Sequence, residues 1–137
     1  MTAQEFRKGL TGFEADMLRE IDLRIRRIGL ELLKKLIDKT PVDTGHLRHN
    51  WQVTINTQTD TELPGEDKGG IATFNREKVK LTNLGYGPLV VFQNPAPYAE
   101  IIEMGRKEKS GSRQAPQGMV RISLQEVANT YGLQVIG

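Results

Sequence analysis

The sequence predicts a single α+β domain, with a long N-terminal amphipathic helix and a C-terminal helix packed on a small, mainly antiparallel β-sheet. Three observations predict this class: helical spacing of apolar residues over the first forty positions, two short stretches of strand type in the middle, and renewed helical spacing near the end. A chain of 137 residues suits one core and is short for two. We therefore expect one domain over residues 1–137.

The long helix is the most strongly patterned element. Its apolar side chains recur at steps of three and four residues, which is typical of a helix with one apolar stripe. The stripe consists of Phe6, Leu10, Phe13, Met17, Ile21, Ile25, Ile28, Leu32, Leu36 and Ile37. Gly9 and Gly12 weaken its start, so we expect the firm helix to begin near Phe13 and residues 1–12 to be flexible. Pro41 disfavours helical geometry in the residue before it and ends the helix there.

A short helical turn and a strand follow the long helix. Asp43 or Thr44 can cap a turn over residues 46–48, because their side-chain oxygens accept hydrogen bonds from backbone N–H groups. Residues 51–57 alternate apolar and polar side chains, which predicts a strand. Residues 58–70 are rich in Thr, Asp, Glu, Gly and Pro, and we expect an exposed loop there.

The segment 71–84 is open to two interpretations. Asn75 can cap a helix that runs through the rest of the segment, or residues 71–74 can form a short strand. The stretch 89–93 is short, apolar and β-branched, which predicts the central strand of the sheet.

Two helices are expected in the last third of the chain. Residues 98–104 space their apolar side chains over two helical turns, and Gly105 ends that helix. The stretch 106–114 is rich in basic and small residues, so we expect a second exposed loop. Pro116 then suits the first turn of the last helix.

Composition narrows the function classes. The absence of cysteine excludes disulfides, thiolate metal sites and cysteine catalysis. No apolar run approaches the roughly 20 residues that cross a bilayer, and no signal peptide is apparent, so we expect no membrane association. Hydrophobic residues make up 37 % of the chain, a thin supply for a core, which favours some stabilisation by neighbouring subunits.

The triplet Asp43-Thr44-Gly45 has two possible meanings. Asp-Thr-Gly is the catalytic signature of aspartic proteases, in which a dimer of the retroviral type shares a proton between two carboxylates. That signature follows an apolar strand in an almost all-β fold, whereas here it follows a long helix and Thr-Pro. A capped turn is therefore the favoured interpretation, with the dimeric protease as the enzyme alternative.

Two other groups of residues carry weaker signals. Asp43, His46 and His49 are spaced three apart, but helical zinc sites place their histidines four apart and add a third strong ligand. We therefore predict no metal and no cofactor. The segment 106–113 holds four basic residues and one acid. It can contact DNA phosphates in a salt-sensitive manner, although a solvated charged loop is the favoured interpretation.

Three motifs in order carry a resemblance to a known family. They are Thr-Pro-Val-Asp-Thr-Gly-His-Leu-Arg at 40–48 followed by Trp51, Asn-x-x-Pro-Tyr-Ala-x-x-Ile-Glu-x-Gly-Arg at 94–106, and Gln-Ala-Pro-Gln-Gly-Met-Val-Arg at 114–121. With the leading helix, they make residues 13–128 resemble the small tail-component proteins of long-tailed bacteriophages, also called tail-completion, neck or minor tail proteins. The segment 106–114 is longer here than in the family pattern.

The resemblance implies a structural virion protein without catalysis, assembled in the cytoplasm of the host bacterium. It implies a homo-oligomeric ring, typically of six subunits, at the head–tail joint or tail end. Partners would be other phage neck and tail proteins, with transient contact to DNA passing through. The motif residues expected to support the turns or the subunit contacts are Pro41, Asp43, Gly45, Arg48, Trp51, Pro97, Tyr98, Glu103, Gly105, Arg106 and Pro116.

Overall fold

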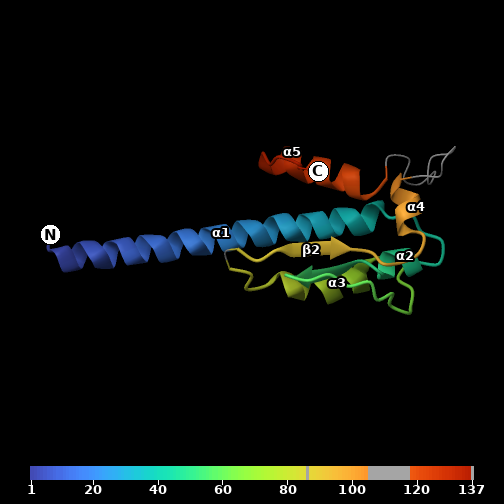
Figure 1. The fold of residues 1–137 in the computed structure, drawn as a ribbon, viewed down its shortest axis with the longest axis horizontal. Helices are drawn as coiled ribbons and strands as arrows, with labels where there is room; N and C mark the ends of the chain where they lie inside the picture. The colour runs from blue at the N-terminus through green and yellow to red at the C-terminus, as the bar shows by residue number, and fades with distance from the viewer. Residues whose placement is uncertain (86, 105–117, 137) are drawn as a thin grey trace.

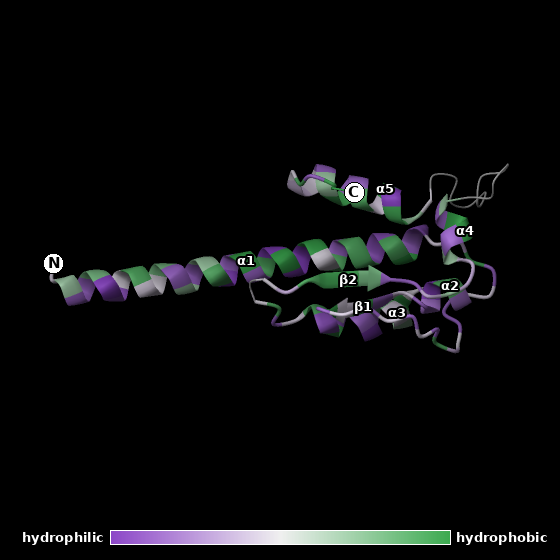
Figure 2. Ribbon diagram, viewed as in Figure 1, coloured by the Kyte–Doolittle hydropathy of each residue, from purple (hydrophilic) through white to green (hydrophobic). Residues whose placement is uncertain are grey.

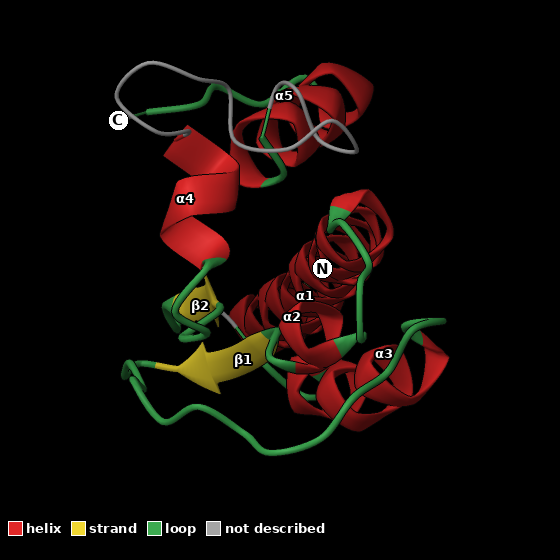
Figure 3. Ribbon diagram, turned by 90° about the vertical axis from the view of Figure 1, so that its right-hand side faces the viewer, coloured by secondary structure: helices red, strands yellow, loops and turns green. Residues whose placement is uncertain are grey.

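A computed structural model of the chain describes residues 1–85, 87–104 and 118–136. One long helix, α1 (Ala3–Lys39), runs through the middle of the molecule and projects well beyond it at the N-terminal end (Figure 1). Helix α5 (Val120–Tyr131) lies along one side of α1, and the strands and α3 (Ile71–Lys78) lie on the other side, as the end-on view shows (Figure 3). The predicted α+β class is confirmed.

Helix α1 begins ten residues earlier than the sequence analysis predicted, so the expected start near Phe13 is wrong. A capping box closes its first turn: the Glu5 N–H donates to the Thr2 hydroxyl at 3.1 Å, and the Thr2 N–H donates to the Glu5 carboxylate at 2.9 Å. These bonds satisfy end groups that would otherwise favour fraying, which offsets the helix-weakening effect of Gly9 and Gly12. The helix ends at Lys39, and its C-cap Thr40 has an extended backbone before Pro41, as predicted.

The strands pair as an antiparallel ribbon. Strand β1 (Gln52–Ile55) aligns with β2 (Val90–Gln93) in a register that places Val53 opposite Phe92. Within the described residues the sheet has two strands, so the expectation that 89–93 forms a central strand is wrong. The apolar character of this stretch reflects packing against the α1-centred core instead, because Val90 and Phe92 contact that core.

The ambiguous segment 71–84 is helical. Helix α3 begins after Gly70, whose φ is +78°, and continues into a 3₁₀ turn, η1 (Val79–Leu81). The strand alternative over residues 71–74 is therefore wrong, and Asn75 lies inside the helix rather than at its cap. The loop 58–70 that precedes α3 is mostly exposed.

The predicted short turn after α1 and the two C-terminal helices are present, and the last helix begins later than predicted. Helix α2 (His46–His49) and helix α4 (Ala99–Met104) follow the two Pro- and Gly-rich segments, as predicted. Helix α5 begins at Val120, four residues after Pro116, so Pro116 does not supply its first turn. Gly105, Arg106, Pro116 and the rest of the expected 106–114 loop lie outside the described residues.

The core surrounds the C-terminal half of α1. Its buried apolar side chains come from α1, β1, η1, α4 and the start of α5. They are Leu33, Leu36, Ile37, Trp51, Val53, Leu81, Ala99 and Met119. In contrast, every side chain from Met1 to Glu20 is exposed, so the stripe of the N-terminal half packs on nothing in the monomer. In the described parts of the chain, no helix has both the length and the apolar character needed to span a bilayer.

Candidate subunit interface

The two Pro- and Gly-rich segments meet at one end of the molecule. Helices α2 and α4, which follow them, lie together at the end opposite the N-terminus (Figure 1). The Asn94 side-chain Nδ2 donates to the Leu47 carbonyl of α2 at 2.8 Å, and the side-chain Oδ1 of Asn94 accepts from the Ala96 N–H at 3.1 Å. Segments about fifty positions apart in the chain therefore form one surface, which we call the turn face (residues 40–49 and 94–104).

Gly45 is the residue that lets the first segment close. It is buried with a φ of +92°, and its carbonyl accepts from the His49 and Asp67 N–H groups at 3.0 and 2.9 Å. A Cβ at this position would lie 2.5 Å from the Lys68 backbone nitrogen. The chain therefore needs glycine here both for its backbone angle and for the close passage of the 58–70 loop.

Arg48 holds the same turn from inside. Its guanidinium donates to three backbone carbonyls, those of Thr40 at 3.0 Å, Asp38 at 3.1 Å and Lys68 at 2.8 Å. Two of these acceptors are the last carbonyls of α1, where a cation is also favoured by the helix dipole. Arg48 thus ties the end of α1 to α2 and to the 58–70 loop.

Trp51 anchors the first segment in the core. The ring is 2 % exposed, and its Nε1–H donates to the Thr40 hydroxyl at 2.7 Å. The Thr40 hydroxyl in turn donates to the Leu36 carbonyl at 2.5 Å. Both side chains are buried with their polar atoms hydrogen-bonded, so their burial leaves no polar group without a partner. The pair fixes the position at which α1 ends and the turn begins.

Glu103 organises the second segment. Its carboxylate accepts the backbone N–H groups of Met119, Val120 and Arg121 at 2.6, 2.7 and 2.9 Å. The Arg121 side chain adds an ion pair at 3.1 Å. Helix α4 therefore supplies the cap for α5 that Met119, the residue at the N-cap position, does not supply with its own side chain.

The environment of Glu103 favours its charged form. Burial of the carboxyl group alone would raise its pKa, but the three backbone N–H donors and Arg121 outweigh burial, and the pKa of Glu103 is lowered. Gly118 leaves room for this arrangement, since a Cβ there would lie 2.7 Å from the carboxylate.

The remaining predicted site residues divide into exposed and undescribed ones. Pro97, Tyr98 and Asp43 are exposed on the turn face, and Pro41 is half-buried beside Thr40. Gly105, Arg106 and Pro116 lie outside the described residues. Arg48 and Glu103 therefore bind backbone groups of their own chain, whereas Pro97 and Tyr98 are exposed at the surface.

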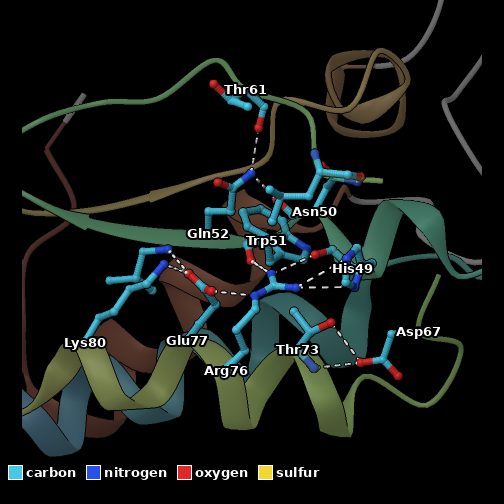
Figure 4. Close-up of polar contacts among 12 residues, drawn as sticks. His49, Asn50, Trp51, Gln52, Thr61, Asp67, Thr73, Arg76, Glu77 and Lys80 are labelled. Atoms are coloured by element: carbon cyan, nitrogen blue, oxygen red, sulfur yellow. Dashed lines mark hydrogen bonds and ion pairs between the residues drawn. The ribbon is translucent and has the colours of Figure 1, made fainter. Parts of the chain in front are cut away.

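An ion cluster around the buried Glu77 carboxylate was missed by the sequence analysis (Figure 4). Glu77 is fully buried, and its carboxylate accepts from the Val53 N–H at 2.8 Å, the Lys80 ammonium at 2.6 Å and the Arg76 guanidinium at 2.6 Å. Burial would raise the pKa of Glu77, but Lys80, Arg76 and the Val53 N–H lower it below its usual value. The spacing Arg76-Glu77-x-x-Lys80 was visible, but its burial was not.

The Arg76 guanidinium extends this cluster to α2. It donates to the backbone carbonyls of His49 and Trp51 at 2.8 and 2.9 Å, and it lies 3.2 Å from His49 Nδ1 (Figure 4). One arginine therefore connects α3 to the end of α2 and to the start of β1.

His46 and Asp67 hold the 58–70 loop in place through hydrogen bonds. The ring nitrogens of His46 lie 2.8 Å from the Gly65 carbonyl oxygen and 2.6 Å from the Glu62 carboxylate, and these two acceptors raise the pKa of His46. Asp67 accepts from the Gly70 N–H at 3.0 Å and from the Thr73 N–H at 2.7 Å, which caps α3. Across the described residues, no group of three His, Cys, Asp or Glu side chains is placed to hold a metal ion.

The Asp-Thr-Gly triplet forms a turn between two helices. The Asp43 side chain is exposed, and the Thr44 hydroxyl accepts the His46 N–H at 3.2 Å within the turn. The N-cap of α2 is Gly45, so the expected side-chain cap from Asp43 or Thr44 is not formed. Helices precede and follow it, which is unlike the strand-and-loop setting that an aspartic protease needs.

Comparison with known families connects this architecture to phage tails. A family model described as "Bacteriophage HK97-gp10, putative tail-component" matches residues 4–105, which include nearly all of α1, both strands and the whole turn face; the Gln-Ala-Pro motif lies beyond that match. Neither the comparison with curated proteins nor that with solved structures found a match. Because the family model covers well over half of the chain, the chain belongs to the HK97-gp10-like family and is a structural tail component of a tailed bacteriophage.

Proposed function

We propose that the protein is a tail-completion or neck component that forms a ring, of six copies, at the head–tail joint or the tail end. Family membership supports a place in the tail. The observation that carries the ring is the turn face, in which Asn94 joins the two stiff segments through the Leu47 carbonyl. In this role the protein assembles in the host bacterial cytoplasm and contacts other neck and tail proteins.

A rigid surface is what a closed ring requires. Each subunit presents one patch to a different patch of its neighbour, and the ring closes when the rotation between them is fixed. The charged side chains that fix the turn face, Arg48 and Glu103, already bind backbone groups of their own chain. Little conformational entropy is then lost on association, which leaves more of the contact energy of Pro97 and Tyr98 for affinity.

Tyr98 is the residue through which to test the ring. Its side chain is 66 % exposed, so Tyr98→Ala should leave the thermal unfolding of the subunit unchanged while weakening ring formation. Light scattering and negative-stain images of the purified protein report the ring, and phage complementation reports joining of tails to heads. Leu89→Ala is the matched control, because Leu89 is 65 % exposed and lies at the far end of the strand pair. Intact rings and infectious particles with Tyr98→Ala would contradict the proposal.

Asp43→Asn separates the structural function from the protease alternative. A structural turn tolerates this change, since the Asp43 side chain is exposed and the hydrogen bond to the His46 N–H comes from the Thr44 hydroxyl. We expect ring formation and tail joining to be retained. Loss of a proteolytic activity of the purified protein on this substitution would establish the enzyme instead.

Contact with DNA stays a sequence-based proposal. The segment 106–113 lies outside the described residues, and its support is its four basic side chains. Neutralising Arg106, Lys107, Lys109 and Arg113 together should abolish any salt-sensitive retention of the protein on DNA. Retention that survives this change would exclude the segment as the contact.

A further inference from the structure

The projecting half of α1 carries an apolar stripe that the monomer does not cover. Phe6, Leu10, Phe13 and Met17 lie on one side of the helix and are between 47 % and 63 % exposed. Figure 2 shows apolar stretches continuing along α1 into the part that extends beyond the rest of the molecule. A contiguous exposed patch of large apolar side chains on a soluble protein marks a contact surface.

The projecting half of α1 is helical up to its N-terminal end. The Thr2–Glu5 capping box closes its first turn, although no other element packs against residues 1–20 within the described structure. A helix of about this length that contains two glycines is only marginally stable alone in water. Packing against another surface would supply the missing stabilisation.

The spacing of the stripe is that of a helix pair. Phe6, Leu10, Phe13 and Met17 are separated by four, three and four residues, which places Leu10 and Met17 at a positions and Phe6 and Phe13 at d positions of two heptads. In an antiparallel pair of two such helices, Leu10 of one copy lies opposite Phe13 of the other, and Phe6 lies opposite Met17. Every apolar position then has an apolar counterpart.

The flanking charges identify a second copy of this chain as the occupant. Arg7 and Glu14 both occupy e positions, which face each other across an antiparallel pair, so Arg7 of each copy meets Glu14 of the other. Neither side chain has an ion-pair partner among the described residues of its own chain. In a parallel pair, each e position faces the g position five residues earlier in the other copy. Arg7 then faces Thr2 and Glu14 faces Gly9, so Arg7 has no acidic partner.

We infer that two copies of the protein associate through antiparallel pairing of the projecting halves of α1. The contact is isologous, so it closes at two copies and is distinct from the heterologous contacts that would build a ring. It does not depend on the proposed ring function. Two heptads make a short interface, and we expect micromolar association of the free protein.

A charge-swap experiment tests the pairing. Arg7→Glu and Glu14→Arg each place like charges at both ends of the interface, so each should raise the dissociation constant by about tenfold or more, measured by light scattering across a dilution series. The double variant Arg7→Glu/Glu14→Arg restores opposite charges and should recover the wild-type value. Lys8→Glu, at the outward f position, is the control and should leave the value unchanged at moderate salt.

Cysteine pairing tests the direction of the helices. The chain has no cysteine, so Gly9→Cys and Asp16→Cys each introduce a single thiol at a g position. Antiparallel pairing predicts a disulfide between Gly9→Cys and Asp16→Cys copies when they are mixed, and none when either variant is oxidised alone. A disulfide between Gly9→Cys and Glu14→Cys copies, which face each other as g and e positions in a parallel pair, would overturn the inference. So would failure of the Gly9→Cys and Asp16→Cys mixture to cross-link, or no recovery by the double charge swap; none of these readouts depends on ring formation.

Discussion

Individual charged side chains hold the turn face together mainly by binding backbone groups. Arg48 donates hydrogen bonds to backbone carbonyls at the end of α1 and in the 58–70 loop. Glu103 accepts hydrogen bonds from the backbone N–H groups at the start of α5. Charge-assisted hydrogen bonds of this kind are stronger than neutral ones. Each of these residues therefore fixes the position of one element relative to another.

Glu103→Gln should lower the free energy of unfolding at neutral pH by about 1–2 kcal/mol, because a neutral amide accepts the α5 N–H groups less strongly and loses Arg121. The folded state lowers the pKa of Glu103, so its contribution is complete above the unfolded value, 4.5, and is lost as the pH falls through the folded value. The difference between variant and wild type should shrink accordingly in acid. Urea denaturation at neutral and acidic pH measures both.

Glu100→Gln is the control for this experiment. Glu100 lies on the same short helix and is exposed, so its replacement should change stability little at either pH. Equal effects of the two substitutions would show that Glu103 does not act through the cap.

Glu77→Ala should cost about 2–3 kcal/mol of unfolding free energy, since it leaves the buried Val53 N–H without its acceptor and removes the counter-charge of Arg76 and Lys80. Chemical denaturation compared with Glu66→Ala, an exposed acid on the 58–70 loop, measures this. A variant as stable as the wild type would mean that the cluster contributes position but no net stability.

At the scale of elements, α3 and α5 depend on capping carboxylates that come from other elements of the chain. Asp67 in the 58–70 loop caps α3, Glu103 in α4 caps α5, and Gly45 opens α2 with a backbone angle that other residues resist. The short elements are therefore stable only when their neighbours are in place, which favours cooperative unfolding of the turn face.

Gly45→Ala should destabilise the protein by about 2 kcal/mol or more, because it combines a left-handed backbone with a Cβ placed 2.5 Å from the Lys68 nitrogen. Gly69→Ala is the matched control, on the 58–70 loop that passes close to Gly45. A Cβ there meets no atom within 4 Å among the described residues, so that variant should be neutral or slightly stabilised. The midpoints of thermal unfolding of the two variants measure this difference. Equal decreases in the midpoint would contradict the explanation by close passage of the 58–70 loop.

At the scale of the whole molecule, α1 divides into a core half and a projecting half. From Leu33 to Ile37 it forms the centre of the core, whereas residues 1–20 are exposed throughout. Stability and association are thus assigned to different lengths of one continuous helix.

Deletion of residues 1–19 should therefore leave the body folded, with a midpoint of thermal unfolding within about 3 °C of the full chain when both are measured at low concentration. The same deletion should remove the association through α1. A large drop in the midpoint would show that the projecting half supports the core directly.

Sequence reasoning succeeded where a signal is local and failed where a partner is distant. The α1 stripe, the stop at Pro41 and the two strands follow from short-range patterns and were predicted. The start of α1 was misplaced because the glycine penalty was weighed without the Thr2–Glu5 cap. The role of Glu77 was missed because its burial depends on how α3 packs against β1.

By itself, the sequence determined the fold class, the long amphipathic helix and the motifs that resemble the phage tail-component family, because periodicity and turn chemistry act over a few residues. Tertiary structure alone decided that the two stiff segments form one face, that Glu103 caps a helix seventeen residues later, and that only the C-terminal half of the α1 stripe is covered. Those facts depend on which distant groups come within contact distance. Burial and hydrogen-bond partners of that kind exist only once the chain has folded.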